Sequence, residues 1–246
     1  MEPVDARSTT NLTDMPPVER TSETSNLVPP NSASSPSFLN LVSNVCALLF
    51  NAIILYCCFK DGVTLFSFHP SLMSLGWIIL MSSAINAITP GDFATEWMPI
   101  RLRSARHWVI QMLAGVIILT GFFVILSNKI INEKSHFVTL HAKFGLASLI
   151  FMCLTSLGGV TALYSLKLKD YIAPIYTKLL HASAGLLTFT LGIITILLGT
   201  LSHWWSYGEI LRYTSMILVL LVMLFTLLRP SLKVYFRLKE RLENMN

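Results

Sequence analysis

Six long apolar stretches alternate with short polar segments along this chain of 246 residues. Each stretch reaches the length of about 20 apolar residues that a helix needs to cross the hydrocarbon core of a membrane. The sequence therefore predicts an all-α membrane protein with six transmembrane helices. The expected helices cover residues 38–59, 65–88, 107–127, 138–163, 175–200 and 210–229.

The chain divides into an N-terminal tail, a membrane domain and a C-terminal tail. Residues 1–37 are rich in Ser, Thr, Asn and Pro and contain no apolar run, so we expect a disordered N-terminal tail. Residues 38–229 form the predicted membrane domain, and residues 230–246 form a short basic C-terminal tail.

Composition supports a membrane protein and indicates its orientation. Only 13% of the residues are charged and 53% are hydrophobic, whereas a soluble domain has about 25% charged residues. An even number of spans puts both termini on one side, and that side holds 13 of the 18 Lys and Arg residues. The positive-inside rule therefore predicts that both termini are cytosolic. The net charge of +5 comes from residues at the membrane boundaries, so it does not indicate nucleic-acid binding.

Four histidines lie near the starts of four consecutive predicted helices: His69, His107, His141 and His181. The second and fourth helices begin on the non-cytosolic side, and the third and fifth begin on the cytosolic side. The topology therefore pairs His69 with His141 near one surface, and His107 with His181 near the other. Histidine inside a membrane is costly and usually functional.

The absence of acidic residues from the predicted spans favours haem iron as the group that these histidines bind. The six predicted spans contain no Asp or Glu, which transporters of protons or metal ions usually need. Two histidines fill both axial positions of a haem iron, and such a haem transfers single electrons. Two alternatives stay open: a haem-free protein that binds or transports a transition metal through histidine, and a haem subunit that needs a partner reductase.

Local motifs around the histidines resemble the cytochrome b561 family, and most closely its short "cytochrome b561 domain-containing" branch. The similarity covers roughly residues 38–235. The matching motifs are Phe68-His69-Pro70-x-Leu72-Met73-Ser74, Arg106-His107-Trp108-x-x-Gln111, Thr139-Leu140-His141 with Gly145, and Leu180-His181-Ala182 with Gly185.

This resemblance implies a four-helix core of spans two to five that holds two b-type haems, with the first and sixth helices flanking it. It implies electron transfer from cytosolic ascorbate to monodehydroascorbate radical or ferric iron on the other side, and a homodimer. The haem ligands would be His69 and His141 at the non-cytosolic haem, and His107 and His181 at the cytosolic haem. An endoplasmic reticulum or endocytic vesicle membrane is expected rather than the plasma membrane.

Basic residues before the third and fifth helices hold cytosolic ascorbate in the family. Here Arg101, Arg103 and Arg106 precede His107, and Lys178 precedes His181. These basic residues can equally be topology signals or headgroup contacts. His136, in the loop between the third and fourth helices, is a candidate contact for the acceptor or an ordinary solvated histidine. The chain departs from the family's well-known ascorbate reductases at Thr139, where they have tyrosine, and at the end of span two.

Overall fold

The computed structural model describes residues 37–89, 91–92, 94–95 and 97–243, so most of the predicted N-terminal tail lies outside the described residues. Every regular element within this range is a helix. Their bounds are α1 Phe38–Phe59, α2 Leu65–Ser74, η1 Leu75–Met81, α3 Ser82–Ala87, α4 Ile100–Ile131, α5 Leu140–Leu163, α6 Pro174–Thr200 and α7 Glu209–Glu243. Because α2, η1 and α3 follow one another without a break, they form a single span, Leu65–Ala87.

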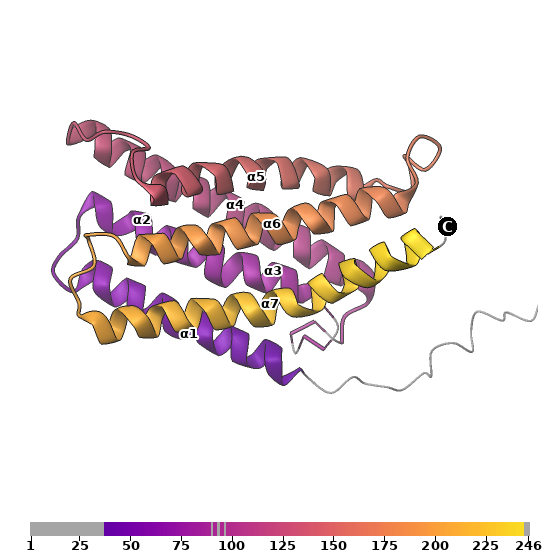
Figure 1. Ribbon diagram of the computed structural model, residues 1–246, viewed down its shortest axis with the longest axis horizontal. Helices are drawn as coiled ribbons and strands as arrows, with labels where there is room; N and C mark the ends of the chain where they lie inside the picture. The colour runs from indigo at the N-terminus through magenta and orange to yellow at the C-terminus, as the bar shows by residue number, and fades with distance from the viewer. Residues whose placement is uncertain (1–36, 90, 93, 96, 244–246) are drawn as a thin grey trace, which may run out of the picture. The chain divides into compact units, whose positions relative to one another are not determined.

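Six helical segments of the described chain are long and apolar enough to cross a membrane, which confirms the predicted fold class. They run up and down, so the start of α1 and the end of α7 lie at the same end of the bundle (Figure 1). We call the end with loops 60–64, 132–139 and 201–208 the loop-132 end. The opposite end, with loops 88–99 and 164–173, is the loop-164 end.

Two spans differ from their predicted bounds at the loop-164 end. Helix α4 begins at Ile100, seven residues before the expected start, and α7 continues through Pro230 to Glu243, well past the expected end at 229. The predicted bounds followed the apolar run alone, whereas the helical hydrogen bonds continue through the basic residues that flank it. The π-helical segment η1 in the middle of the second span was also not predicted.

The helix starts place the four histidines at fixed depths. At the loop-132 end, Thr64 and Thr139 cap α2 and α5 by accepting hydrogen bonds from the backbone N–H groups of Ser67 and Ala142. At the loop-164 end, α6 begins with Pro174, which has no N–H to leave unsatisfied at the first helical position. These start signals lie close to His69, His141 and His181, so they set the level of these three imidazoles along the bundle.

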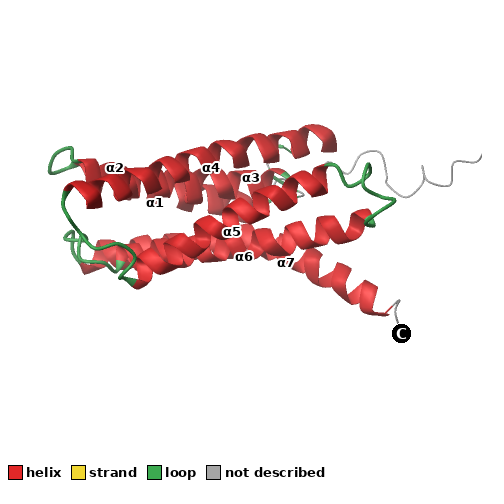
Figure 2. Cartoon of the chain, turned by 90° about the horizontal axis from the view of Figure 1, so that it is seen from above, coloured by secondary structure: helices red, strands yellow, loops and turns green. Residues whose placement is uncertain are grey.

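The described helices form two groups in the view from above, with α1 to α4 on one side and α5 to α7 on the other (Figure 2). The tightly packed core joins α1, η1, α6 and α7, and its fully buried side chains include Phe50, Ile193 and Val219. The indole of Trp77 lies directly against the backbone of Gly192, so this position accommodates no larger residue. The Ser43 and Thr226 hydroxyls form a buried hydrogen bond of 3.1 Å that fixes the register of α1 against α7.

Candidate functional site

The four predicted histidines form two facing pairs, each made by one residue from each group of helices. The ring centres of His69 on α2 and His141 on α5 are 6.1 Å apart, with an angle of 83° between the ring planes. The ring centres of His107 on α4 and His181 on α6 are 6.3 Å apart, at 82°. The first pair lies near the loop-132 end and the second toward the loop-164 end.

Each histidine uses its Nδ1 atom to bind a backbone carbonyl of a neighbouring helix. The partners and distances are Gly121 for His69 at 3.0 Å, Ala84 for His107 at 2.7 Å, Thr195 for His141 at 2.9 Å and Thr155 for His181 at 3.2 Å. A carbonyl oxygen only accepts, so Nδ1 must carry the hydrogen in all four rings. The lone pair is then on Nε2, which is the arrangement of a histidine that binds a metal.

These histidine–carbonyl hydrogen bonds run in both directions within each of two helical hairpins. His69 bonds to α4 while His107 on α4 bonds back to α3, across separations of 52 and 23 residues. His141 and His181 make the same exchange between α5 and α6, across 54 and 26 residues. The two hairpins therefore present their histidines in the same way, and each facing pair takes one histidine from each hairpin.

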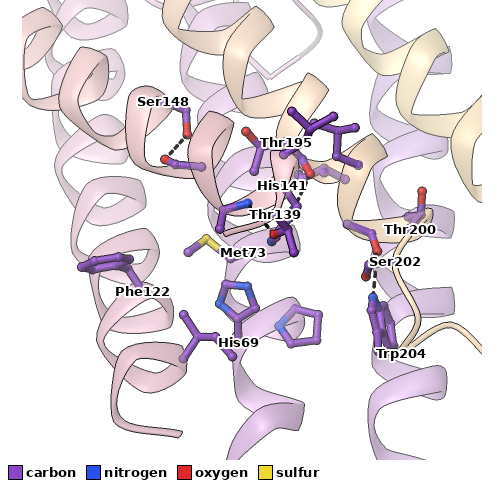
Figure 3. Close-up of a pocket in the computed structure, with 18 of the residues that line it drawn as sticks. His69, Met73, Phe122, Thr139, His141, Ser148, Thr195, Thr200, Ser202 and Trp204 are labelled. Carbon is purple, nitrogen blue, oxygen red and sulfur yellow. Dashed lines mark hydrogen bonds between the residues drawn. The ribbon is translucent and has the colours of Figure 1, made fainter. Parts of the chain in front are cut away.

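A cavity of about 560 Å³ surrounds the His69/His141 pair. Its wall is mostly apolar and aromatic and includes Phe66, Met73 and Trp204. Figure 3 shows His69 and His141 reaching into it from separate helices, with Trp204, a residue of loop 201–208, nearby. Cofactor pockets have volumes of about 300–1,000 Å³ and a mostly apolar lining, so the cavity suits a flat apolar cofactor such as a porphyrin.

The spacing of the imidazoles also fits one metal atom between them. An imidazole nitrogen binds a first-row metal at about 2 Å, which puts the centres of two opposed rings about 6 Å apart. The measured separations of 6.1 and 6.3 Å agree with this value. Both pairs therefore fit bis-histidine ligation of a haem iron.

Two glycines lie directly against the histidine rings. A Cβ atom added to Gly199 would be 3.2 Å from Cε1 of His141, and one added to Gly159 would be 3.1 Å from Cε1 of His181. Sequence reasoning missed both positions, because each glycine lies on the partner helix and not on the histidine's own helix. Of the glycines on the histidines' own helices, Gly145 lines the cavity, whereas Gly76 packs tightly against the Ile118 side chain.

The basic residues expected near the third and fifth helices are placed in two environments. Arg101 and Lys178 are exposed at the loop-164 end. Arg103 and Arg106 are half-buried within the first turns of α4, where the Nε of Arg103 donates to the Met98 carbonyl at 2.9 Å. The Nε of Arg106 is buried and finds no hydrogen-bond partner within the described part of the chain. Arg101, Arg103 and Arg106 therefore lie inside α4 rather than before it, because α4 starts earlier than its apolar run.

His136 lies at the cavity of the first pair, together with Lys129 and His203. His136 is exposed, and the Lys129 ammonium donates to the Ser135 carbonyl at 2.7 Å. Lys129 was not predicted as a site residue. Its position near the end of α4 carried no motif that would have distinguished it from a boundary lysine.

Trp204 is a further residue that the sequence did not reveal as part of the site. Its indole Nε1 donates to the Gly199 carbonyl at 2.9 Å, and Gly199 is the residue against the His141 ring. The ring of Trp204 also lies 5.9 Å from that of Phe66, which is 6.5 Å from the His69 ring. One indole thus connects the surroundings of both histidines.

Comparison with known proteins adds the family to this geometry. The family model described as eukaryotic cytochrome b561 matches residues 68–206, a range that contains all four histidines. The human transmembrane reductase CYB561D2 is 35% identical to this chain over 147 residues, and the mouse probable transmembrane reductase CYB561D1 is 30% identical over the same length. The first match covers 60% of this chain and 66% of the human protein, and the second covers 60% and 64%. The chain is an integral multi-pass membrane protein and belongs to the cytochrome b561 family, in its short domain-containing branch.

Proposed function

We propose that this protein transfers single electrons across its membrane, from cytosolic ascorbate to monodehydroascorbate radical or ferric iron on the opposite side. The observation that carries the proposal is the shared geometry of the four histidines. All four Nδ1 atoms donate to backbone carbonyls, and the rings face each other in two pairs about 6 Å apart. The names of the relatives, which are transmembrane reductases, support the reaction class.

Two b-type haems are the cofactors in this proposal. His69 and His141 would hold one, and His107 and His181 would hold the other. A bound haem with two histidine ligands supplies a one-electron carrier that does not readily bind oxygen. The backbone carbonyls fix the tautomer and orientation of each ring, which would otherwise need rearrangement before binding.

The orientation in the membrane is part of the proposal. The excess of basic residues at the termini and the loop-164 end favours the cytosol for that end. His107 and His181 would then lie on the cytosolic side, and His69 and His141 on the lumenal side. We propose the endoplasmic reticulum or an endocytic vesicle as the location, and a homodimer as the assembly, in keeping with the family resemblance.

Charged residues at each end suit the proposed substrates. Ascorbate is an anion at neutral pH, and Arg101, Arg103, Arg106 and Lys178 give the loop-164 end a positive potential that attracts it. At the loop-132 end, His136 and Lys129 lie at the cavity that contains the first histidine pair. They are our candidates for contact with the acceptor.

The alternative of a haem-free metal protein has less support. Sites for a transition metal held by protein alone usually have three or four ligands. Among the described residues, no group of three or more His, Cys, Asp or Glu side chains lies close enough to hold a metal ion. Two facing imidazoles need a planar cofactor to complete the coordination of iron, which is what porphyrin provides. The third option, a haem subunit that works only with a partner reductase, is separated by experiment.

Reconstituted vesicles test the function. The purified chain is inserted into vesicles loaded with a ferric chelate, and ascorbate is added outside. We expect internal iron to become ferrous only in vesicles that contain the protein, and the rate to fall strongly in His107→Ala and His69→Ala variants. Haem-containing protein that leaves the internal iron ferric would favour the partner-dependent subunit, and folded protein that binds metal without porphyrin would favour the haem-free alternative.

A further inference from the structure

Three aromatic rings lead from the first histidine pair to the surface at the loop-132 end. The Trp204 indole lines the cavity that contains His69 and His141 (Figure 3). The ring centre of Trp204 lies 5.5 Å from that of Trp205, and the ring centre of Trp205 lies 6.3 Å from that of Tyr207. We call Trp204, Trp205 and Tyr207 the aromatic chain.

The middle ring of the aromatic chain is shielded from water, and its two neighbours touch it edge to face. Trp205 is only 4% exposed, and its indole Nε1 donates to the Gly208 carbonyl at 3.2 Å. Both ring separations fall within the 4.5–7 Å range of favourable aromatic contacts. Indole and phenol groups can each lose one electron and be reduced again, which apolar aliphatic side chains cannot do. The aromatic chain therefore offers a path for single electrons between the cavity and Tyr207.

The Tyr207 hydroxyl has partners that suit the loss and return of a hydrogen atom. It lies 2.5 Å from the Cys57 carbonyl oxygen and 3.0 Å from the Asp61 carboxylate. Burial, together with the hydrogen bond to Asp61, raises the pKa of Tyr207 to about 12, so the phenol keeps its hydrogen at neutral pH. Asp61 is exposed and can pass a proton from water to the phenol oxygen.

The position of Tyr207 indicates which oxidants can reach it. Tyr207 lies two residues before α7, and its hydroxyl contacts the last turn of α1, so it lies where two spans end. The Lys60 ammonium is 5.6 Å from the Tyr207 ring centre, which also places this ring at the edge of the hydrocarbon. A peroxyl group on a lipid or other organic molecule is polar, so it favours this boundary over the apolar interior.

The chemistry of a neutral phenol selects the same oxidants. Monodehydroascorbate radical and ferric chelates are too weak as oxidants to take an electron from it, so Tyr207 does not lie on the path to these acceptors. An organic peroxyl radical can remove the hydroxyl hydrogen, because the O–H bond of a hydroperoxide is about as strong as that of a phenol. The aromatic chain therefore suits a second reaction that differs from the reduction of the ordinary acceptor.

We propose that the aromatic chain reduces organic peroxyl radicals at the loop-132 end, with Tyr207 as the hydrogen donor; this rests on the proposed haem at His69 and His141. The O–H bond of Tyr207 breaks, and its hydrogen atom forms the O–H bond of a hydroperoxide. The resulting tyrosyl radical takes one electron from the ferrous haem through Trp205 and Trp204, and one proton from water by way of Asp61. In total, one peroxyl radical, one proton and one electron give one hydroperoxide, and one haem iron is oxidised from ferrous to ferric.

Electron paramagnetic resonance tests the hydrogen donor. The full-length protein, with its haems kept ferric, is placed in phosphatidylcholine vesicles, and peroxyl radicals are generated by a lipid-soluble or a water-soluble azo initiator. We expect a neutral tyrosyl signal that Tyr207→Phe abolishes. Tyr213→Phe is the matched control and keeps the signal, because Tyr213 is 57% exposed near the start of α7 but lies outside the aromatic chain. The initiator that produces the signal shows whether the radicals come from the lipid or from water.

The optical spectrum of the reduced protein tests the electron path. The haems are reduced with ascorbate, the excess is removed, and the lipid-soluble initiator is added. In the native protein we expect the ferrous band to decay without a tyrosyl signal, whereas in Trp205→Phe the band decays more slowly and the tyrosyl signal persists.

Equal decay of the ferrous band in the native protein, Tyr207→Phe and Trp205→Phe would overturn this inference alone, provided that ascorbate reduces the haems of all three. A tyrosyl signal that survives in Tyr207→Phe would do the same. A folded preparation without haem would overturn the proposed function together with this inference.

Discussion

The two histidine pairs have nearly identical internal geometry but different surroundings. Their ring separations differ by only 0.2 Å and their interplanar angles by 1°. At the loop-132 end, His69 and His141 follow shortly after the threonine caps of α2 and α5, and loop 201–208 borders their cavity. The other two histidines each lie seven residues into their helices, α4 and α6, next to basic residues. The comparison indicates that the repeated hairpins determine the geometry of each histidine pair. The residues at the helix ends determine which molecules can approach it.

Replacing a single histidine by alanine should have the largest effect, because it removes the haem of one pair and leaves the haem of the other pair in place. His107→Ala and His181→Ala should each remove the same haem, about half of the total, because a single imidazole leaves one axial position of that iron without its ligand. Optical and electron paramagnetic resonance spectra of the purified variants check this, with His69→Ala and His141→Ala removing the other component. If His69→Ala and His107→Ala abolished one common component, the pairing would be wrong.

Adding a methyl group beside an imidazole should disturb one pair and spare the other. In Gly159→Ala the new Cβ would lie 3.1 Å from the His181 ring, which is held by the Thr155 carbonyl, so we expect a cost of about 1–3 kcal/mol. Haem retention and midpoint potential at the His107/His181 pair report the change. Gly158→Ala is the matched control, because a Cβ at this neighbouring position meets no atom within 4 Å. Equal effects of both variants would show that helix propensity, not ring contact, is responsible.

The loop at the first pair offers a smaller test. Trp204→Phe keeps an aromatic ring but removes the Nε1 donor to the Gly199 carbonyl, a loss of about 1 kcal/mol. We expect a shift in the midpoint potential of the His69/His141 haem alone. Trp205→Phe removes a donor to the Gly208 carbonyl, farther from the histidine, and should leave both potentials unchanged. A shift at the second pair in Trp204→Phe would contradict the local role of this indole.

The smallest effect concerns pH at the same loop. Burial, together with the hydrogen bond to Asp61, raises the pKa of Tyr207 from 10.0 to about 12. A raised pKa means that folding favours the neutral phenol, so this stabilisation is complete below pH 10 and is lost as the pH rises toward 12. The thermal stability of the native protein should exceed that of Tyr207→Phe at pH 8, and the difference should shrink above pH 10. A constant difference would show that the Tyr207 hydroxyl does not titrate in this way.

The sequence predicted the parts of the fold that depend on contact with lipid. Apolar runs report where a helix faces hydrocarbon, so the six spans were found and the fold class was confirmed. The same signal is silent about helix beyond the hydrocarbon, and for this reason the early start of α4 at Ile100 and the continuation of α7 past Pro230 were missed. A π-helical segment such as η1 depends on tertiary packing and leaves no periodic trace.

The sequence predicted only the part of the site that depends on the identity of its side chains. Histidine is rare in membrane helices, so the four positions were evident from the chain, and topology predicted which of them would approach each other. The carbonyl groups of Gly121 and Thr195 could not be found this way, because every residue has a carbonyl. Gly76 shows that a glycine on the same helix as a histidine need not make room for a cofactor, because the Ile118 side chain packs against it.

The haem content of the purified chain tests the central claim most directly. The pyridine haemochrome assay, combined with a titration of the reduced α-band by ascorbate, gives both the number of haems and their reducibility. We expect two b-type haems per chain, with both reduced by ascorbate. A folded protein without haem, or one whose single haem survives the loss of either histidine pair, would contradict the account.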